Sequence, residues 1–164
     1  MTITLGFDVY GTLIDTAGIT EALKKHTGEN AAAFSSLWRD KQLEYSFRRG
    51  LMQNYQHFAV CTRNGLDYVC AVMGYDISPE DRDRLMDQYR ILPAFPDVQE
   101  ALPRLQQGDF RLFAFSNGRK ADVCSLLEHS GISSFFSDVI STDEIKSFKP
   151  NPAVYAHFLR RTGA

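Results

Sequence analysis

The chain has little net charge, few cysteines and no long apolar run. Its 164 residues carry a formal charge of −2 at pH 7, so it lacks the strongly basic field that would gather nucleic acid or an acidic membrane surface. No apolar stretch approaches the roughly 20 residues that a membrane-spanning helix needs. We therefore expect a protein whose partners are neither nucleic acids nor membranes.

The number and spacing of the cysteines exclude further classes of protein. Cys61, Cys70 and Cys124 are odd in number and show no C-x-x-C spacing, which argues against a disulfide framework and against a zinc site. The amino terminus enters an apolar stretch without the basic region of a signal peptide. We also find no internal repeat and no low-complexity segment. These features predict a soluble, cytoplasmic protein in a reducing compartment.

What the sequence does contain is an ordinary globular composition, with 44% hydrophobic and 23% charged residues, enough for one sizeable core. Short apolar runs predict strands over residues 3–7, 111–115 and 137–141. Strands that alternate with helices form parallel sheets with right-handed crossovers. We therefore predict an α/β fold: a doubly wound (Rossmann-like) parallel sheet made by residues 1–14 and 95–164, with a helical cap, residues 15–94, inserted into it.

The cap has the pattern of several amphipathic helices. Apolar residues at three-and-four spacing predict helices over 30–49 and 55–73. Gly74 is placed to end the second one. Ser78 followed by Pro79 is typical of an N-cap and a first helical residue, so a third helix is expected to begin there.

The segment after the cap alternates between helix and strand. Helices are predicted over 98–107 and 120–129, and a last helix is predicted to begin at Asn151. Pro103 lies inside the first of these and should kink or shorten it, because proline lacks the backbone N–H that a helix interior needs. In the last helix we expect three apolar side chains to point inward: Val154, Phe158 and Leu159.

Polar side chains follow the predicted strands where each one ends. Asp8 comes directly after the first strand, and in open parallel sheets the groups at this edge face the ligand crevice. Gly11 then lets the backbone turn sharply, and Thr12 offers a hydroxyl beside the carboxylate. An Asp after a strand also commonly caps a turn, and this alternative interpretation remains open.

The second and third strands add groups to the same edge. Ser116, Asn117 and Gly118 follow the second strand and can either face an anion or cap the next helix. Lys149 stands before Pro150, which fixes the approach of the lysine. Beside a buried Asp this lysine would hold the carboxylate ionised, although a lone lysine is most often solvated.

These motifs resemble, in this order, the first three motifs of the haloacid dehalogenase-like superfamily: Asp-Val-Tyr-Gly-Thr-Leu at residues 8–13, Ser-Asn-Gly at 116–118 and Lys-Pro at 149–150. Most of that superfamily are magnesium-dependent phosphatases with a second Asp two positions after the nucleophile. This sequence has Tyr10 there, as in the 2-haloacid dehalogenase branch.

The cap also resembles that branch. Leu-Trp-Arg-Asp-Lys-Gln-Leu-Glu-Tyr at residues 37–45 is similar to its cap-helix signature, in which the arginine, here Arg39, reaches into the active site. Arg39 could instead direct its charge to solvent. Phe58 and Tyr155 match positions that bind substrate in that branch, although aromatic residues on helices are more often part of a core.

The resemblance implies hydrolytic dehalogenation of short 2-haloalkanoic acids. Asp8 attacks C2, displaces halide and forms an ester, which water then hydrolyses. Lys149 keeps Asp8 charged, and Thr12 and Ser116 hold Asp8 and the substrate carboxylate. Arg39 and Asn117 receive the halide, and neither a metal nor another cofactor is expected. The resemblance further implies S-2-haloacid substrates and a homodimer.

Two alternatives remain open at this stage. One is a magnesium-dependent phosphatase of the same superfamily, against which Tyr10 argues. The other is an inactive domain, because the family's fourth motif, a Ser, an Asn and an Asp on a later strand, has no match after Tyr155. We expect the chain to be a C-terminally truncated member, inactive or nearly so without that motif.

Overall fold

The computed structural model describes residues 2–164 and contains a three-stranded parallel sheet in the order β1-β2-β3. Phe7 of β1 pairs with Ala114 of β2, and Ser116 of β2 pairs with Ser141 of β3. The carboxyl ends of the strands therefore lie together, as the sequence predicts. The strands are β1 (Ile3–Phe7), β2 (Phe110–Ser116) and β3 (Asp138–Ser141).

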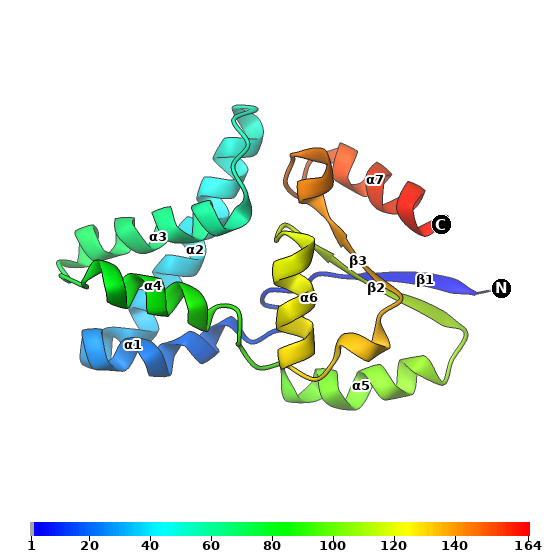
Figure 1. Cartoon of the computed structure of the whole chain (residues 1–164), viewed down its shortest axis with the longest axis horizontal. Coiled ribbons are helices and arrows are strands. Elements are labelled where there is room, and N and C mark those ends of the chain that lie inside the picture. Colours follow the sequence, from blue (N-terminus) through cyan, green and yellow to red (C-terminus); the bar gives the residue numbers. More distant parts are fainter. Residues whose placement is uncertain (1) are drawn as a thin grey trace.

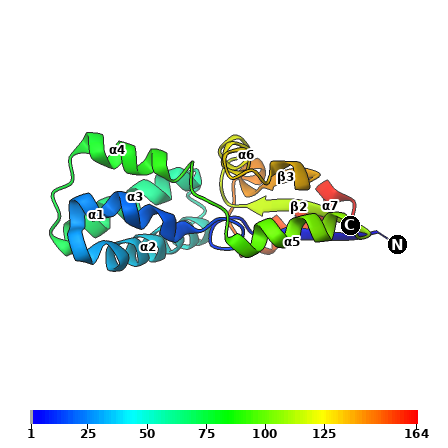
Figure 2. The same ribbon diagram turned by 90° about the horizontal axis from the view of Figure 1, so that it is seen from below.

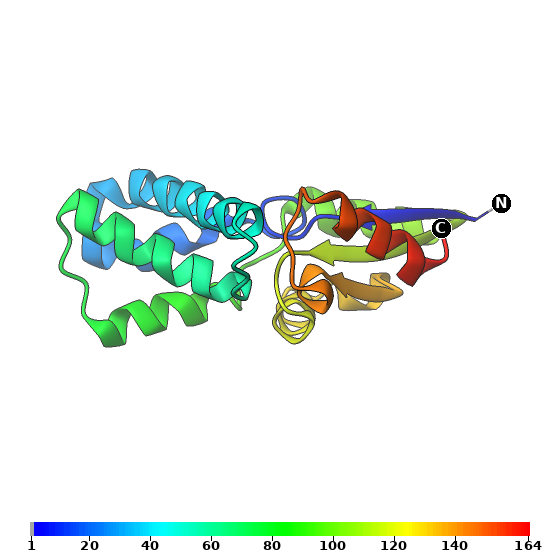
Figure 3. The same cartoon turned by 90° about the horizontal axis from the view of Figure 1, so that it is seen from above.

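Helices cover both faces of this sheet. Leu112 and Ala114 of β2 belong to the same buried cluster as the core residues of α5 and α6, whereas Phe113 and Phe115 pack with Val154 of α7. The alternation along β2 thus places α7 on the opposite face (Figure 3). This is the predicted doubly wound arrangement. The helical segments are α5 (Pro96–Gln106), α6 (Lys120–His129), η3 (Ser133–Phe135), η4 (Thr142–Ile145) and α7 (Pro152–Thr162).

The inserted block forms a helical lobe beside the sheet (Figures 1 and 2). Ser78 caps α4 by accepting from the backbone N–H of Asp81 at 3.1 Å, and Gly74 ends α3 with a left-handed φ of 73°. Both signals stand where the sequence predicts them. The segments are η1 (Thr16–Gly18), α1 (Ile19–Thr27), η2 (Gly28–Asn30), α2 (Ala31–Leu51), α3 (Phe58–Met73) and α4 (Pro79–Gln88).

The longest helix of the lobe, α2, packs closely against α3. A Cβ at Gly65 of α3 would lie 3.1 Å from the backbone nitrogen of Gln42 and 3.2 Å from the Trp38 ring, so glycine permits this approach. The indole N–H of the fully buried Trp38 donates to the carbonyl of Thr62 at 2.7 Å. The two helices are therefore joined by hydrogen bonds as well as by apolar packing.

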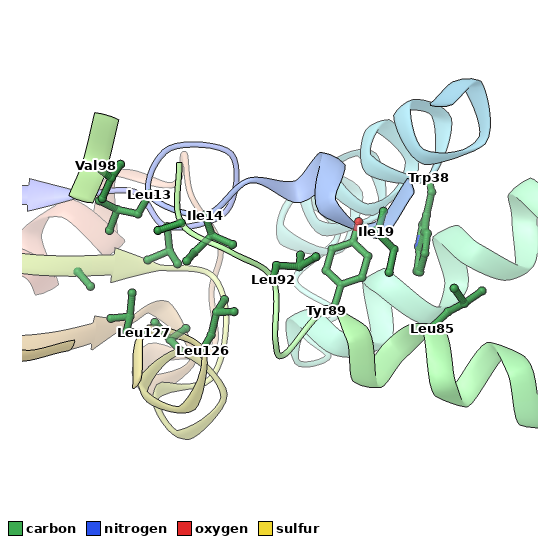
Figure 4. Packing of buried hydrophobic residues seen from close by; sticks show 14 of the residues in the cluster. Leu13, Ile14, Ile19, Trp38, Leu85, Tyr89, Leu92, Val98, Leu126 and Leu127 are labelled. Carbon is green, nitrogen blue, oxygen red and sulfur yellow. The ribbon is translucent and has the colours of Figure 1, made fainter. Parts of the chain in front are cut away.

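The two connections between the lobes run side by side. Asp15 N–H donates to the Pro93 carbonyl at 2.9 Å and Phe95 N–H donates to the Leu13 carbonyl at 3.1 Å. One continuous buried cluster passes through this junction (Figure 4). It includes Leu13, Ile14, Leu92, Leu126 and Leu127 near the sheet and Ile19, Trp38 and Leu85 in the helical lobe.

Helix α5 continues past Pro103 to Gln106, so the proline does not end it, and Leu102 beside it is buried. One expectation about the last helix is wrong. Leu159 is 50% exposed, because α7 buries Val154 and His157 instead, and Leu159 lies farther round the helix. In the described part of the chain no helix is both long and apolar enough to cross a membrane.

Candidate active site

Asp8 follows the last residue of β1 and stands at the entrance of a tight loop. The Gly11 N–H donates to the Ile14 carbonyl at 2.8 Å, and Gly11 has a φ of +85°, which glycine adopts without strain. Thr12 Oγ1 lies 3.4 Å from Asp8 Oδ2, a long hydrogen bond. The loop therefore turns away from the strand and leaves the Asp8 carboxylate, 46% exposed, facing outward from the sheet edge.

Lys149 pairs with this carboxylate from the other end of the chain. Its Nζ donates to Asp8 Oδ1 at 2.5 Å and to the Phe115 carbonyl at 2.8 Å. The Lys149 side chain is only 17% exposed, and its peptide bond to Pro150 is cis. The ammonium group thus fixes one oxygen of Asp8 and leaves the other to act on a ligand.

Ser116 ends β2 beside this pair, and Asn117 follows it. Asn117 Oδ1 accepts from the backbone N–H of Lys149 at 2.8 Å and from Thr142 Oγ1 at 3.3 Å. With its oxygen occupied, the Asn117 amide can act on a ligand only as a donor. Ser116 Oγ accepts from the Gly118 N–H at 3.0 Å, which leaves its own proton to donate. Both side chains are therefore arranged to receive an anion.

Arg39 of α2 reaches from the helical lobe to the loop after β1. Its Nη2 donates to the Tyr10 carbonyl at 2.8 Å, and its Nη1 donates to Gln42 Oε1. Burial lowers the pKa of Arg39, and the nearby Asp8 charge opposes this effect. A guanidinium stays protonated at neutral pH in either case. Because the Tyr10 carbonyl and the Gln42 amide oxygen are both neutral acceptors, the charge of the guanidinium is available to an anion in the cavity.

A cavity of about 270 Å³ lies between the two lobes at this point. Arg39, Leu43 and Phe47 follow one another at four-residue spacing, so one face of α2 forms its wall. This spacing was available in the sequence, but Leu43 and Phe47 are not among the predicted site residues. The cavity is lined by Asp8, Tyr10, Arg39, Leu43, Phe47, Phe58, Ser116, Asn117, Lys149 and Pro150.

The predicted aromatic residues behave differently from one another. The rings of Tyr10 and Phe58 lie 6.0 Å apart in the cavity wall, and burial, with a smaller contribution from Asp122, raises the pKa of Tyr10. Tyr10 is therefore a neutral phenol and not a base. Tyr155 does not line this cavity: it is 46% exposed, and its ring packs at 5.8 Å against Phe115. Thr12 contacts Asp8 but does not line the cavity either.

The architecture and the placement of these groups define a class of protein: a doubly wound sheet with a helical insertion, and an Asp, a Ser-Asn pair and a Lys at adjoining strand ends. The family model for haloacid dehalogenase-like hydrolases matches residues 4–164. The chain belongs to the haloacid dehalogenase-like hydrolase family.

Individual relatives fall in one branch of the family. The chain is 37% identical to haloacetate dehalogenase H-2 of Moraxella sp. (strain B), over 92% of this chain and 67% of that protein. It is 36% identical to (S)-2-haloacid dehalogenase 2 of Pseudomonas sp. (strain CBS-3), over 91% and 65%. The chain thus spans about two thirds of the length of these relatives.

Solved structures agree with this placement. L-2-haloacid dehalogenase from Xanthobacter autotrophicus matches with a TM-score of 0.91 and 30% identity, over 100% of this chain and 66% of that one. A second structure of that enzyme, with chloropropionic acid covalently bound, matches with the same TM-score, 29% identity and the same coverage of both chains. The similarity includes both the sheet and the helical lobe, because it extends over the whole chain.

Proposed function

We propose that this protein hydrolyses short 2-haloalkanoic acids to 2-hydroxy acids through an ester on Asp8. The observation that carries the proposal is the Asp8 carboxylate, fixed by Lys149 in a cavity that also receives the cationic Arg39. Tyr10 stands where the phosphatases of this superfamily have their second acid. The names of the relatives support the same reaction class.

In the first step an oxygen of Asp8 attacks C2 of the substrate. The new C–O bond forms as the carbon–halogen bond breaks, and the halide leaves with the bonding electrons, so C2 is inverted. Arg39 and Asn117 offer N–H donors to the departing halide, and Ser116 with Thr12 holds the carboxylates. In the second step water attacks the ester carbonyl and releases the 2-hydroxy acid, the Asp8 carboxylate and a proton.

The apolar walls of the cavity would keep water away from the Asp8 carboxylate, which is a weak nucleophile when hydrated. Leu43, Phe47 and Phe58 surround the site with apolar surface, and a carboxylate that has lost its water attacks more readily. Fixed near-attack geometry can contribute roughly 7 to 11 kcal/mol to such a reaction. We propose that residues 15–94 act as the cap that excludes water, over a core made by residues 1–14 and 95–164.

A single-turnover experiment tests the reaction directly. The protein, produced at the full length of its relatives and in excess over chloroacetate or S-2-chloropropionate, should release halide and carry an adduct on the peptide that contains Asp8. Asp8→Asn should give neither. EDTA should leave the rate unchanged. Turnover of p-nitrophenyl phosphate that EDTA abolishes, without halide release, would assign the chain to the magnesium-dependent phosphatases instead.

The stereochemical preference for the substrate, the oligomeric state and the cellular compartment are part of the same proposal. We infer a preference for S-2-haloacids from the relatives' names. A homodimer is consistent with the outer edge of β1, where Ile3 is 54% exposed and which has no partner strand among the described residues. The free thiols of Cys61, Cys70 and Cys124 are consistent with a reducing cytoplasm.

A further inference from the structure

Gln42 lies behind the substrate cavity, on the same helix as Arg39, and is almost completely buried. Only 1% of Gln42 is exposed, and both ends of its side-chain amide have hydrogen-bond partners. Oε1 accepts from Arg39 Nη1, and Nε2 donates to Thr62 Oγ1 of α3. A buried amide is costly unless it is hydrogen-bonded, so this placement requires a compensating interaction at each end.

The direction of these bonds is fixed from the far end. The Thr62 hydroxyl donates its single proton to the Phe58 carbonyl at 3.1 Å, so Thr62 Oγ1 can only accept from Gln42. The NH₂ group of Gln42 must then face Thr62, and its oxygen must face Arg39. A flipped amide would put its NH₂ donors against the guanidinium and its oxygen against the Thr62 oxygen, whose proton is already used. The chain of bonds therefore has one polarity.

From this polarity we propose that Gln42, held by Thr62, is a positioning residue that orients the Arg39 guanidinium toward the cavity without neutralising it. A carboxylate in the same place would pair with the guanidinium charge and compete with an anionic ligand. A neutral amide oxygen, together with the Tyr10 carbonyl, restrains the planar group and keeps its charge for the ligand. This inference rests on the proposed function for the identity of the ligand only.

The arrangement depends on the close approach of α2 and α3. Gly65 lies against the backbone nitrogen of Gln42, and no larger residue fits there without a shift. This contact brings Thr62, which is 4% exposed, within reach of the amide. Thr62 thus acts on the cavity from a second helix, through Gln42, although it does not line that cavity itself.

Nitrogen-15 NMR of the arginine side chains in the ligand-free protein tests this directly. Arg39→Lys assigns the Arg39 signals. We expect slow guanidinium rotation, seen as separate Nη–H signals, in the wild type and in Thr62→Ser, which keeps the hydroxyl. Gln42→Leu and Thr62→Val should shift and average these signals. Ser46→Ala, which removes another buried hydroxyl of α2 that bonds only the Leu43 carbonyl, should leave them unchanged. Unchanged Arg39 signals in Gln42→Leu overturn the proposal.

Halide release gives a second and separate readout. Gln42→Leu should lower kcat/KM for chloroacetate about tenfold to a hundredfold, the loss expected for a hydrogen bond to a charged group. The same change made in Arg39→Lys should have little further effect, because Gln42 acts through Arg39. Equal losses in both backgrounds overturn the positioning role. Wild-type protein that releases no halide, but shows the predicted NMR changes, refutes the proposed reaction and leaves the positioning role standing.

Discussion

Lys149 should matter most after the ester has formed. Its Nζ lies 2.5 Å from Asp8 Oδ1, and in the proposed reaction this oxygen would carry the negative charge when water attacks the ester carbonyl. During the first step the same ammonium attracts a carboxylate whose charge is being lost to the new bond, so it contributes mainly orientation. We therefore expect Lys149→Met to slow ester hydrolysis more than halide release.

The magnitude follows from the contacts of the ammonium group. Removing one donor to a developing oxyanion costs about 10²- to 10³-fold in rate, or roughly 2.7 to 4 kcal/mol. Orientation of Asp8 in the first step is worth less, about tenfold, the lower limit for a charge-assisted hydrogen bond. The backbone N–H of Lys149, which holds Asn117, is untouched by the substitution. Methionine keeps an unbranched side chain of similar length, but it lacks the ammonium group, whose Nζ lies 4.9 Å from the centre of the Phe115 ring.

Rapid-quench measurements separate the two steps. Halide release and hydroxy-acid formation are followed with chloroacetate in the wild type and in Lys149→Met, and mass spectrometry detects the ester on Asp8. The variant should accumulate ester after a slowed release of halide. If both steps fall by the same factor and no ester accumulates, Lys149 acts before or during the attack, and the assignment to oxyanion stabilisation is wrong.

Four other outcomes are expected. Asp8→Asn should lose turnover while circular dichroism stays unchanged, because an amide cannot form the ester. Arg39→Lys should lower kcat/KM about tenfold to a hundredfold in a halide-release assay, because a point charge does not replace a planar set of donors. Burial opposes ionisation of Asp143, but the Tyr55 hydroxyl at 2.6 Å and Lys146 lower the pKa of this carboxyl overall. The ionised Asp143 therefore stabilises the fold at pH values above the ordinary pKa of Asp, and this stabilisation is lost as the pH falls through the lowered pKa. Tyr55→Phe should thus reduce the free energy of unfolding by about 1 kcal/mol at pH 7 and by less in acid, measured by urea titration. Ile3→Lys should reduce any self-association seen by sedimentation, because a charge on an open strand edge opposes pairing; equal association of both forms would exclude this edge.

Local signals in the sequence predicted most of the sheet. Asp8 and Ser116 each follow a short apolar run, and the carboxyl ends of parallel strands must meet at one edge, so their proximity required no knowledge of the cap. The predicted helix starts at Ser78 and Asn151 were equally local, since each depends on one side chain and the next few backbone groups, and the structure shows both side chains capping a helix. The short helix α1 was not separately predicted, because its pattern merges with the rest of the helical block.

The second wall of the cavity could not be predicted in this way. The role of Arg39 came from a resemblance, because helical spacing alone does not say which lobe a charged residue reaches. Gln42 has no local signal at all: its burial depends on Thr62 and Gly65, about twenty positions away on another helix. Leu159 was misplaced because apolar spacing in a short helix allows two faces, and contacts with the sheet decide between them.

The position of the insertion ties the cap to the nucleophile. The chain leaves the core at Ile14, a few residues after Asp8, and returns at Ala94, where the two residues form an antiparallel bridge. Arg39 bonds the Tyr10 carbonyl in this same short loop. The bridge and this hydrogen bond therefore both fix how Arg39 lies relative to Asp8, the two charged groups that we propose act on opposite ends of the breaking bond. Substitutions at the Ile14–Ala94 bridge are therefore expected to affect the position of Arg39 as well as that of the nucleophile loop.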